Sequence, residues 1–261
     1  EVYKKIWKSR TSVENDLDDL FDNMIPIRNK IAENAGFSNY RDYIFKAKGR
    51  FDYDPEDCFE FHEAVLKEVV PLLDDIALDR KNKLGLEELK PWDLLIDKNG
   101  KKPLKPFKNG RELTEKGIQL FSRVDPFFGK CLATMDEIGH LDLESRKNKS
   151  PGGYNYPLDE IGVPFIFMNA TSTFRDMITL MHEGGHAVHS FLTRDYDLLP
   201  YKHPTSEVAE LASMSMELLT MDYWDEYFDS EDELLRAKEE HLEQIVETLP
   251  WVAVIDKFQH W

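Results

Sequence analysis

The feature that most constrains the fold is a recurring helical spacing of apolar residues. Near the start of the chain the spacing is 4, 3, 4, 3 and 4 residues, and it links Val13, Leu17, Leu20, Met24, Ile27 and Ile31. Such spacing places the side chains on one stripe of an amphipathic helix. Helical patterns return after Asp54-Pro55, from about Leu113 to Ile138, and through most of residues 173–260. The sequence therefore predicts a mainly α fold.

One stretch, from Leu141 to Asn169, departs from the helical pattern. Pro151-Gly152-Gly153-Tyr154 predicts a turn, and the segment Val163–Met168 is typical of a short strand. We expect a small β insert here, directly before a helix over residues 173–193.

The charge balance excludes two classes of partner. The chain carries 50 Asp+Glu against 33 Lys+Arg, a net charge of −17. An acidic surface repels phosphate backbones and anionic lipids, so neither nucleic acid nor a membrane surface is expected as a partner. Cys58 and Cys131 lie far apart without a C-x-x-C motif, which favours a reducing compartment, the cytoplasm.

The helix over residues 173–193 contains the pattern His-Glu-x-x-His. His182 and His186 are one helical turn apart, so both imidazoles can reach a single ion, and Glu183 lies beside them. This pattern is typical of two zinc ligands and a general base. Gly184 and Gly185 each cost about 1 kcal/mol inside a helix. That cost indicates that another part of the structure must approach the helix backbone here. It argues against a chance match of the motif on an ordinary helix.

The third zinc ligand must come from another element, because a catalytic zinc keeps three protein ligands and an open position. The next helix places Glu207, Glu210 and Glu217 on one stripe among small and apolar residues. We expect Glu210 to be the third ligand and Glu217 to accept a hydrogen bond from a ligating imidazole. Glu207 is interpreted as a first-turn carboxylate favoured by the helix dipole. His189 is expected behind the ligands, since a fourth protein ligand would close the site.

Three segments together carry a resemblance to a known family. They are His182-Glu183-x-Gly185-His186-Ala187-x-His189, then Ala209-Glu210-Leu211-Ala212-Ser213 with Glu217, and Pro151-Gly152-Gly153-Tyr154 followed by Pro164–Asn169. From about Leu17 onward the chain resembles the zinc oligopeptidases, the family of thimet oligopeptidase and oligoendopeptidase F, and most closely the latter. The resemblance implies a helical gluzincin fold like that of neurolysin and oligoendopeptidase.

The resemblance also implies an activity and a cofactor. It implies one Zn²⁺ per chain, held by His182, His186 and Glu210, with Glu183 as general base. The expected reaction is hydrolysis of internal bonds in short, unstructured peptides.

The turn and strand before the zinc helix have two interpretations. By the resemblance they form the edge of a cleft, with substrate contacts at Gly152, Gly153 and Tyr154. An ordinary hairpin that supports the zinc helix explains the same three residues equally well.

We expect residues 1–140 to be the helical part of one peptidase domain and residues 141–261 its zinc-binding part. The chain opens at Glu1 without an initiator Met or a signal, and it stops before the segment in which the family places oxyanion-stabilising His and Tyr groups. It therefore resembles an internal fragment, truncated at both ends, and the sequence leaves open whether this fragment alone is active. Gly184 also stands where relatives carry a bulkier apolar residue.

Two alternative functions stay open. The first is a zinc carboxypeptidase of similar helical fold, which would use the same ligands. The second is a fragment that binds zinc and peptide without turnover. The sequence does not indicate the oligomeric state.

Overall fold

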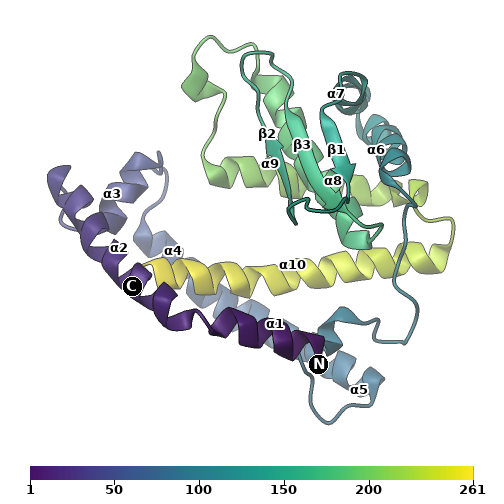
Figure 1. Cartoon of the computed structure of the whole chain (residues 1–261), viewed down its shortest axis with the longest axis horizontal. Coiled ribbons are helices and arrows are strands. Elements are labelled where there is room, and N and C mark those ends of the chain that lie inside the picture. Colours follow the sequence, from purple (N-terminus) through teal and green to yellow (C-terminus); the bar gives the residue numbers. More distant parts are fainter. Residues whose placement is uncertain (261) are drawn as a thin grey trace. The chain divides into compact units, whose positions relative to one another are not determined.

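The computed structural model describes residues 1–260 and is mainly α-helical with one small sheet (Figure 1). This confirms the fold class expected from the sequence. The chain divides into two compact units, one made of Glu1–Lys101 with the chain from Glu243 onward, the other of Lys102–Leu242. Helix α10 (Glu231–His260) contributes to both. The organisation of the peptidase domain expected from the sequence, with a boundary at residue 140, stays a prediction.

The first unit is helical throughout its regular structure. Its elements are α1 (Val2–Thr11), α2 (Glu14–Asn34), α3 (Tyr40–Ala47), α4 (Pro55–Ala64), a π-helical turn η1 (Val65–Val69), α5 (Val70–Leu84), the 3₁₀ turn η2 (Asp93–Leu95) and the end of α10. The start of α4 follows its sequence signal, because Asp54 accepts hydrogen bonds from two backbone amides in a capping box with Asp57. The apolar stripe of α2 stays exposed, with Leu17 and Leu20 each 56% accessible.

The second unit surrounds the sheet with helices. It contains α6 (Gly110–Val124), α7 (Pro126–Glu137), β1 (Leu141–Glu144), β2 (Gly153–Tyr156), β3 (Phe165–Ala170), α8 (Phe174–Thr193), η3 (Leu199–Tyr201), α9 (Ser206–Thr220), η4 (Met221–Glu226) and the start of α10. The helical stretch expected from Leu113 to Ile138 is two helices. Asp125 ends the first helix and caps the second, because its side chain accepts a hydrogen bond from the Phe127 backbone amide. Pro126 stands at the first position of the second helix, where its missing N–H costs nothing.

The sheet has the order β1-β3-β2, with β3 parallel to β1 and antiparallel to β2. On β3 the residues Ile166, Met168 and Ala170 are buried in alternation, as a half-buried strand requires. Helix α8 packs against β3 and β2 on one side and against α9 on another (Figure 1). None of the helices within residues 1–260 is long and apolar enough to cross a membrane.

Candidate metal centre

Helix α8 positions the His-Glu-x-x-His segment. It begins at the capping box of Thr173 and Asp176, in which each side chain accepts from the other residue's backbone amide. Met177, Leu180 and Met181 lie in the core with no measurable exposure, so one face of the helix is anchored. The imidazoles of His182 and His186 remain partly open, at 26% and 18% exposure.

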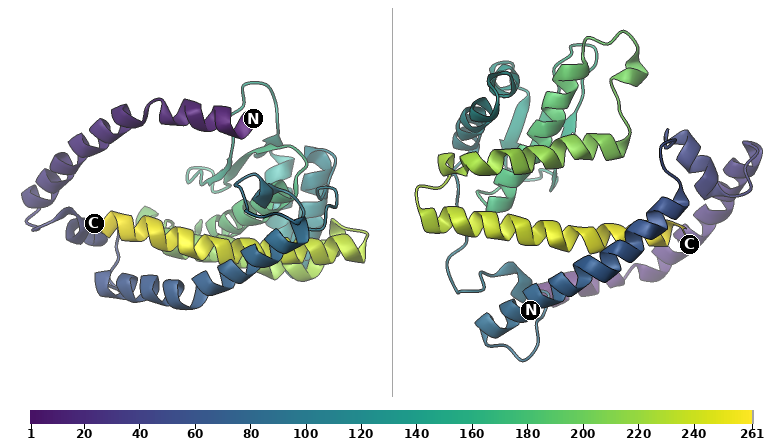
Figure 2. Two further views of the ribbon diagram at one scale, coloured as in Figure 1. Left: turned by 90° about the horizontal axis from the view of Figure 1, so that it is seen from below. Right: turned by 180° about the vertical axis from the view of Figure 1, so that it is seen from behind.

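Helices α8 and α9 cross in contact with each other (Figure 2), and Gly185 faces α9 at this crossing. A Cβ added to Gly185 would lie 2.8 Å from Ser213 Cα and 2.9 Å from Met216 Cβ, both on α9. A side chain here would therefore push the two backbones apart. Gly184 has a different neighbour, since its added Cβ would lie 2.6 Å from Cζ of the Phe121 ring. The two glycines account for the close packing on which the centre depends.

The crossing brings His182, His186 and Glu210 together. One ligand atom from each lies within 4.8 Å of the other two. Glu210 Oε2 is 3.2 Å from His182 Nε2, and Glu210 Oε1 is 3.7 Å from His186 Nε2. The two imidazole rings are nearly perpendicular, at 86°. Two imidazoles and one carboxylate are the donor set of many catalytic zinc sites, so these residues fit that ion.

A second layer of side chains holds the three candidate ligands. His182 Nδ1 lies 2.7 Å from Glu217 Oε1, which leaves Nε2 to face Glu210. Glu217 Oε2 lies 3.3 Å from Nε2 of the buried His241 on α10. Ser213 Oγ donates to Glu210 Oε2 at 3.0 Å. The sequence pattern had indicated Glu217; it had indicated neither His241 nor Ser213.

Glu183 lies on α8 between the two histidines and is 7% exposed. Burial raises the pKa of its carboxyl group, while a hydrogen bond from the Asn155 backbone amide and the charge of His182 oppose the rise. The Asn155 contact places strand β2 directly beside this carboxylate.

The two histidines differ electrostatically. Burial lowers the pKa of His186, and the charge of Glu210 opposes the fall. Burial alone would also lower the pKa of His182, but the hydrogen bond to Glu217 and the surrounding carboxylates raise it above its usual range. The carboxylates of Glu217, Glu183 and Glu210 all act on His182, whereas Glu210 is the carboxylate that acts on His186.

The other residues singled out in the sequence lie outside the three-residue cluster. His189 is on α8, and within residues 1–260 its imidazole makes no hydrogen bond or ion pair. Glu207 is in the first turn of α9. Tyr154 is on β2, 50% exposed, and its ring stacks on Phe167 at 5.1 Å. Gly152 precedes the strand with φ of +101°, a conformation that favours glycine.

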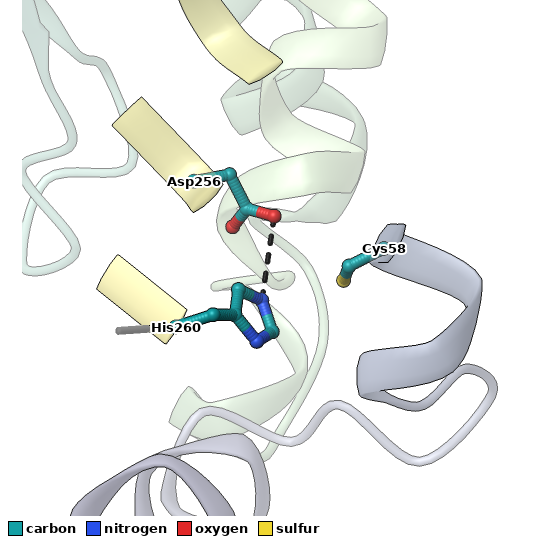
Figure 3. Close-up of side chains that lie close together, drawn as sticks. All are labelled: Cys58, Asp256 and His260. Carbon is teal, nitrogen blue, oxygen red and sulfur yellow. Dashed lines mark ion pairs between the residues drawn. The ribbon is translucent and has the colours of Figure 1, made fainter. Parts of the chain in front are cut away.

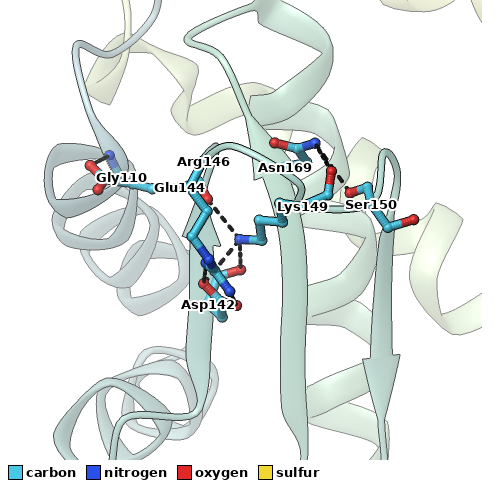
Figure 4. A network of polar contacts seen from close by, with 7 residues as sticks. All are labelled: Gly110, Asp142, Glu144, Arg146, Lys149, Ser150 and Asn169. Atoms are coloured by element: carbon cyan, nitrogen blue, oxygen red, sulfur yellow. Dashed lines mark hydrogen bonds and ion pairs between the residues drawn. The ribbon is translucent and has the colours of Figure 1, made fainter.

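A polar network fixes the loop before β2 (Figure 4). The Lys149 side chain is 1% exposed, and its ammonium group donates to Asp142 Oδ1 and to the Asp142 and Glu144 carbonyl oxygens, at 2.7 to 2.9 Å. The Asn169 amide donates to the Ser150 carbonyl oxygen at 3.1 Å. Residues 146–154 and Phe167 line a pocket beside this network. The loop is thus tied to β1 and β3, which sets the position of β2.

Comparison with known proteins places the chain in a family. The model of Peptidase family M3 matches residues 1–261. The chain belongs to Peptidase family M3. It is 27% identical over 209 residues to the oligopeptidase PepF of Bacillus subtilis, with 79% of this chain and 30% of that protein covered. An oligoendopeptidase F homolog of Lactococcus lactis is 26% identical over 166 residues, which cover 64% of this chain and 27% of the relative.

The fold is also shared with a solved structure. The structure of PZ peptidase A with an inhibitor superposes with a TM-score of 0.89 at 30% identity, covering 99% of this chain and 46% of that one. The chain therefore spans 30% of the Bacillus relative and less than half of the solved peptidase. The resemblance to the oligoendopeptidases expected from the sequence is confirmed.

Proposed function

We propose that this chain is the zinc-binding part of a peptidase that hydrolyses internal bonds of short, unstructured peptides. The observation that carries the proposal is the meeting of His182, His186 and Glu210, with the buried Glu183 beside them. Membership of Peptidase family M3 supports the reaction class.

The proposed cofactor is Zn²⁺, which His182, His186 and Glu210 would hold. When bound, it would supply Lewis acidity that polarises the scissile carbonyl group and favours ionisation of water at neutral pH. Glu217 orients the His182 ring through its hydrogen bond to Nδ1, and Ser213 orients the Glu210 carboxylate.

Glu183 is the proposed general base. Its carboxylate would take a proton from the attacking water and pass it to the leaving amine. Burial raises the pKa of this carboxyl group, and a general base with a raised pKa binds a proton more readily. The Asn155 amide fixes one side of the carboxylate, so the group stays oriented.

Strand β2 is the proposed docking edge for the peptide. It pairs with β3 on one side only within the described sheet, and the Asn155 amide directs its other edge toward Glu183. An extended peptide can add to such an edge through backbone hydrogen bonds. Contacts at Gly152, Gly153 and Tyr154 follow from this proposal. If β2 only supports α8, Tyr154→Ala will leave KM unchanged.

A peptide blocked at both termini tests the reaction. We expect cleavage at an internal bond by the zinc-loaded protein, in this chain or in a longer form that contains it. A carboxypeptidase would leave that peptide intact but trim one with a free carboxyl end. Zinc and peptide binding without either product would identify a binding fragment. The cytoplasm remains the proposed compartment, on the cysteine pattern described above.

A further inference from the structure

A second group of metal-binding side chains lies in the first unit. Cys58 and His62 are on α4, and Asp256 and His260 are on the last part of α10. Each pair has a spacing of four residues, which places its members on one helix face, one turn apart. Figure 3 shows the side chains of Cys58, Asp256 and His260 pointing toward a common centre.

The spacing of the donor atoms suits an ion. One ligand atom from each of Cys58, Asp256 and His260 lies within 4.8 Å of the other two, the same limit that holds at the His182 centre. Tetrahedral zinc keeps its nitrogen, oxygen and sulfur ligands roughly 3.3–3.6 Å apart. Small side-chain rotations therefore suffice to close the group around one ion.

The surroundings already orient the donors. His62 Nε2 lies 2.8 Å from Asp256 Oδ2, and His260 Nε2 lies 3.4 Å from the same oxygen. The rings of Phe45 and Phe59 pack edge-on against the His260 ring. The two imidazoles are 4% and 5% exposed, so they are held in a largely dry environment.

Two buried nitrogens in this group lack partners. Nδ1 of His62 and Nδ1 of His260 are inaccessible to solvent and make no hydrogen bond within residues 1–260. Buried polar atoms in folded proteins are nearly always satisfied, so an unpartnered imidazole nitrogen requires an explanation, and a bound ion is one. The His260 ring belongs to the three-residue cluster and can offer either nitrogen to an ion.

We propose that Cys58, Asp256 and His260 bind a divalent ion of the zinc class, and that His62 positions the Asp256 carboxylate. A thiolate and an imidazole favour zinc over magnesium or calcium. Asp256 is 30% exposed, so water can reach a fourth position. The ion would link α4 to the end of α10 and so stabilise the first unit. The site uses no residue of the proposed catalytic centre.

Cobalt titration of the intact chain tests the site, because Co²⁺ bound to a thiolate gives a charge-transfer absorption that nitrogen and oxygen ligands do not give. The His182 centre contains no sulfur, so the absorption reports the second site alone. We expect a saturable absorption with the intensity of one thiolate-bound Co²⁺ per chain, while a second Co²⁺ at the His182 centre adds nothing to it. Cys58→Ser should abolish it, and the matched change Cys131→Ser, at a buried cysteine outside the cluster, should preserve it.

Further variants separate the two centres. His260→Ala should remove the absorption, and His62→Ala should weaken cobalt binding roughly tenfold to a hundredfold. Glu210→Ala should lower the total metal content and leave the absorption intact. The proposal is overturned if the wild-type chain shows no thiolate absorption at saturating cobalt, or if the absorption survives Cys58→Ser or survives His260→Ala at the same affinity.

Discussion

His182 Nδ1 lies 2.7 Å from Glu217 Oε1, so a hydrogen bond joins the zinc-motif helix α8 to α9. The other oxygen of Glu217 faces His241 on α10 at 3.3 Å. A line of three side chains therefore crosses three helices behind the candidate ligands. Because Glu217 is only 12% exposed, solvent screens this arrangement weakly.

Glu217→Gln should weaken zinc binding roughly tenfold to a hundredfold, since a neutral amide orients His182 less firmly and makes it a poorer donor. A competition titration against a chelator measures the affinity. Glu207→Gln is the matched control, because Glu207 lies in the first turn of the same helix. Equal zinc affinity in the Glu217→Gln variant and the parent would show that the hydrogen bond does not support the metal.

Glu183→Gln should retain zinc and lower kcat roughly 10²-fold to 10⁴-fold, because the amide cannot accept the proton of the attacking water. The assay is cleavage of the doubly blocked peptide in the form of the protein that shows activity. Glu210→Ala is the contrasting variant, and it should lose zinc itself. Parental turnover in Glu183→Gln would remove the general-base assignment.

Gly185→Ala should destabilise the chain by about 1–3 kcal/mol, since the added methyl group meets the α9 backbone at Ser213 Cα. It should also weaken zinc binding by moving Glu210 away from the histidines. Gly184→Ala is the control, because its methyl group meets the Phe121 ring and leaves the α8 to α9 contact alone. Urea unfolding of the metal-free chain measures the loss of stability, and zinc titration measures the loss of affinity. Equal zinc affinity in Gly185→Ala and Gly184→Ala would contradict this account.

The parts of the fold and site that the sequence predicted are those that depend on residues close together in the chain. The spacing of His182 and His186 and the helix start at Asp54-Pro55 depend on residues within one or two turns, so they are visible in the sequence. At the start of α3 two neighbouring residues, Ser38 and Asn39, are of types that cap helices, and in the structure Asn39 accepts from the Asp42 backbone amide. Both residue types cap helices well, and only the backbone geometry distinguishes them.

The features that the sequence did not indicate depend on contacts between distant segments. His241 meets Glu217 only because α10 passes α9, and no spacing rule links the two positions. Lys149 follows Arg146 and Lys147 in the sequence, and its ammonium group donates to carbonyl oxygens of β1 in the structure. A long cationic side chain can be buried when oxygens surround it, and a sequence does not show which lysine meets that condition.

We expect Asp142 to make the free energy of unfolding of the second unit depend on pH in the acid range. Its hydrogen bond from Arg146, followed by that from Lys149, lowers its pKa from 3.8 to about 2. A carboxyl group with a depressed pKa in the folded state adds stability that is fully present above pH 4 and is lost as pH falls toward 2. Asp142→Asn should remove this contribution, so its free energy of unfolding should fall less between pH 4 and pH 2 than that of the parent. Urea titrations across that range measure the difference.

Asp136→Asn is the control. The Asp136 carboxylate lies near the end of α7 and pairs with the exposed Arg111. Parallel pH profiles for the parent and Asp142→Asn would show that the Lys149 network does not stabilise the loop before β2.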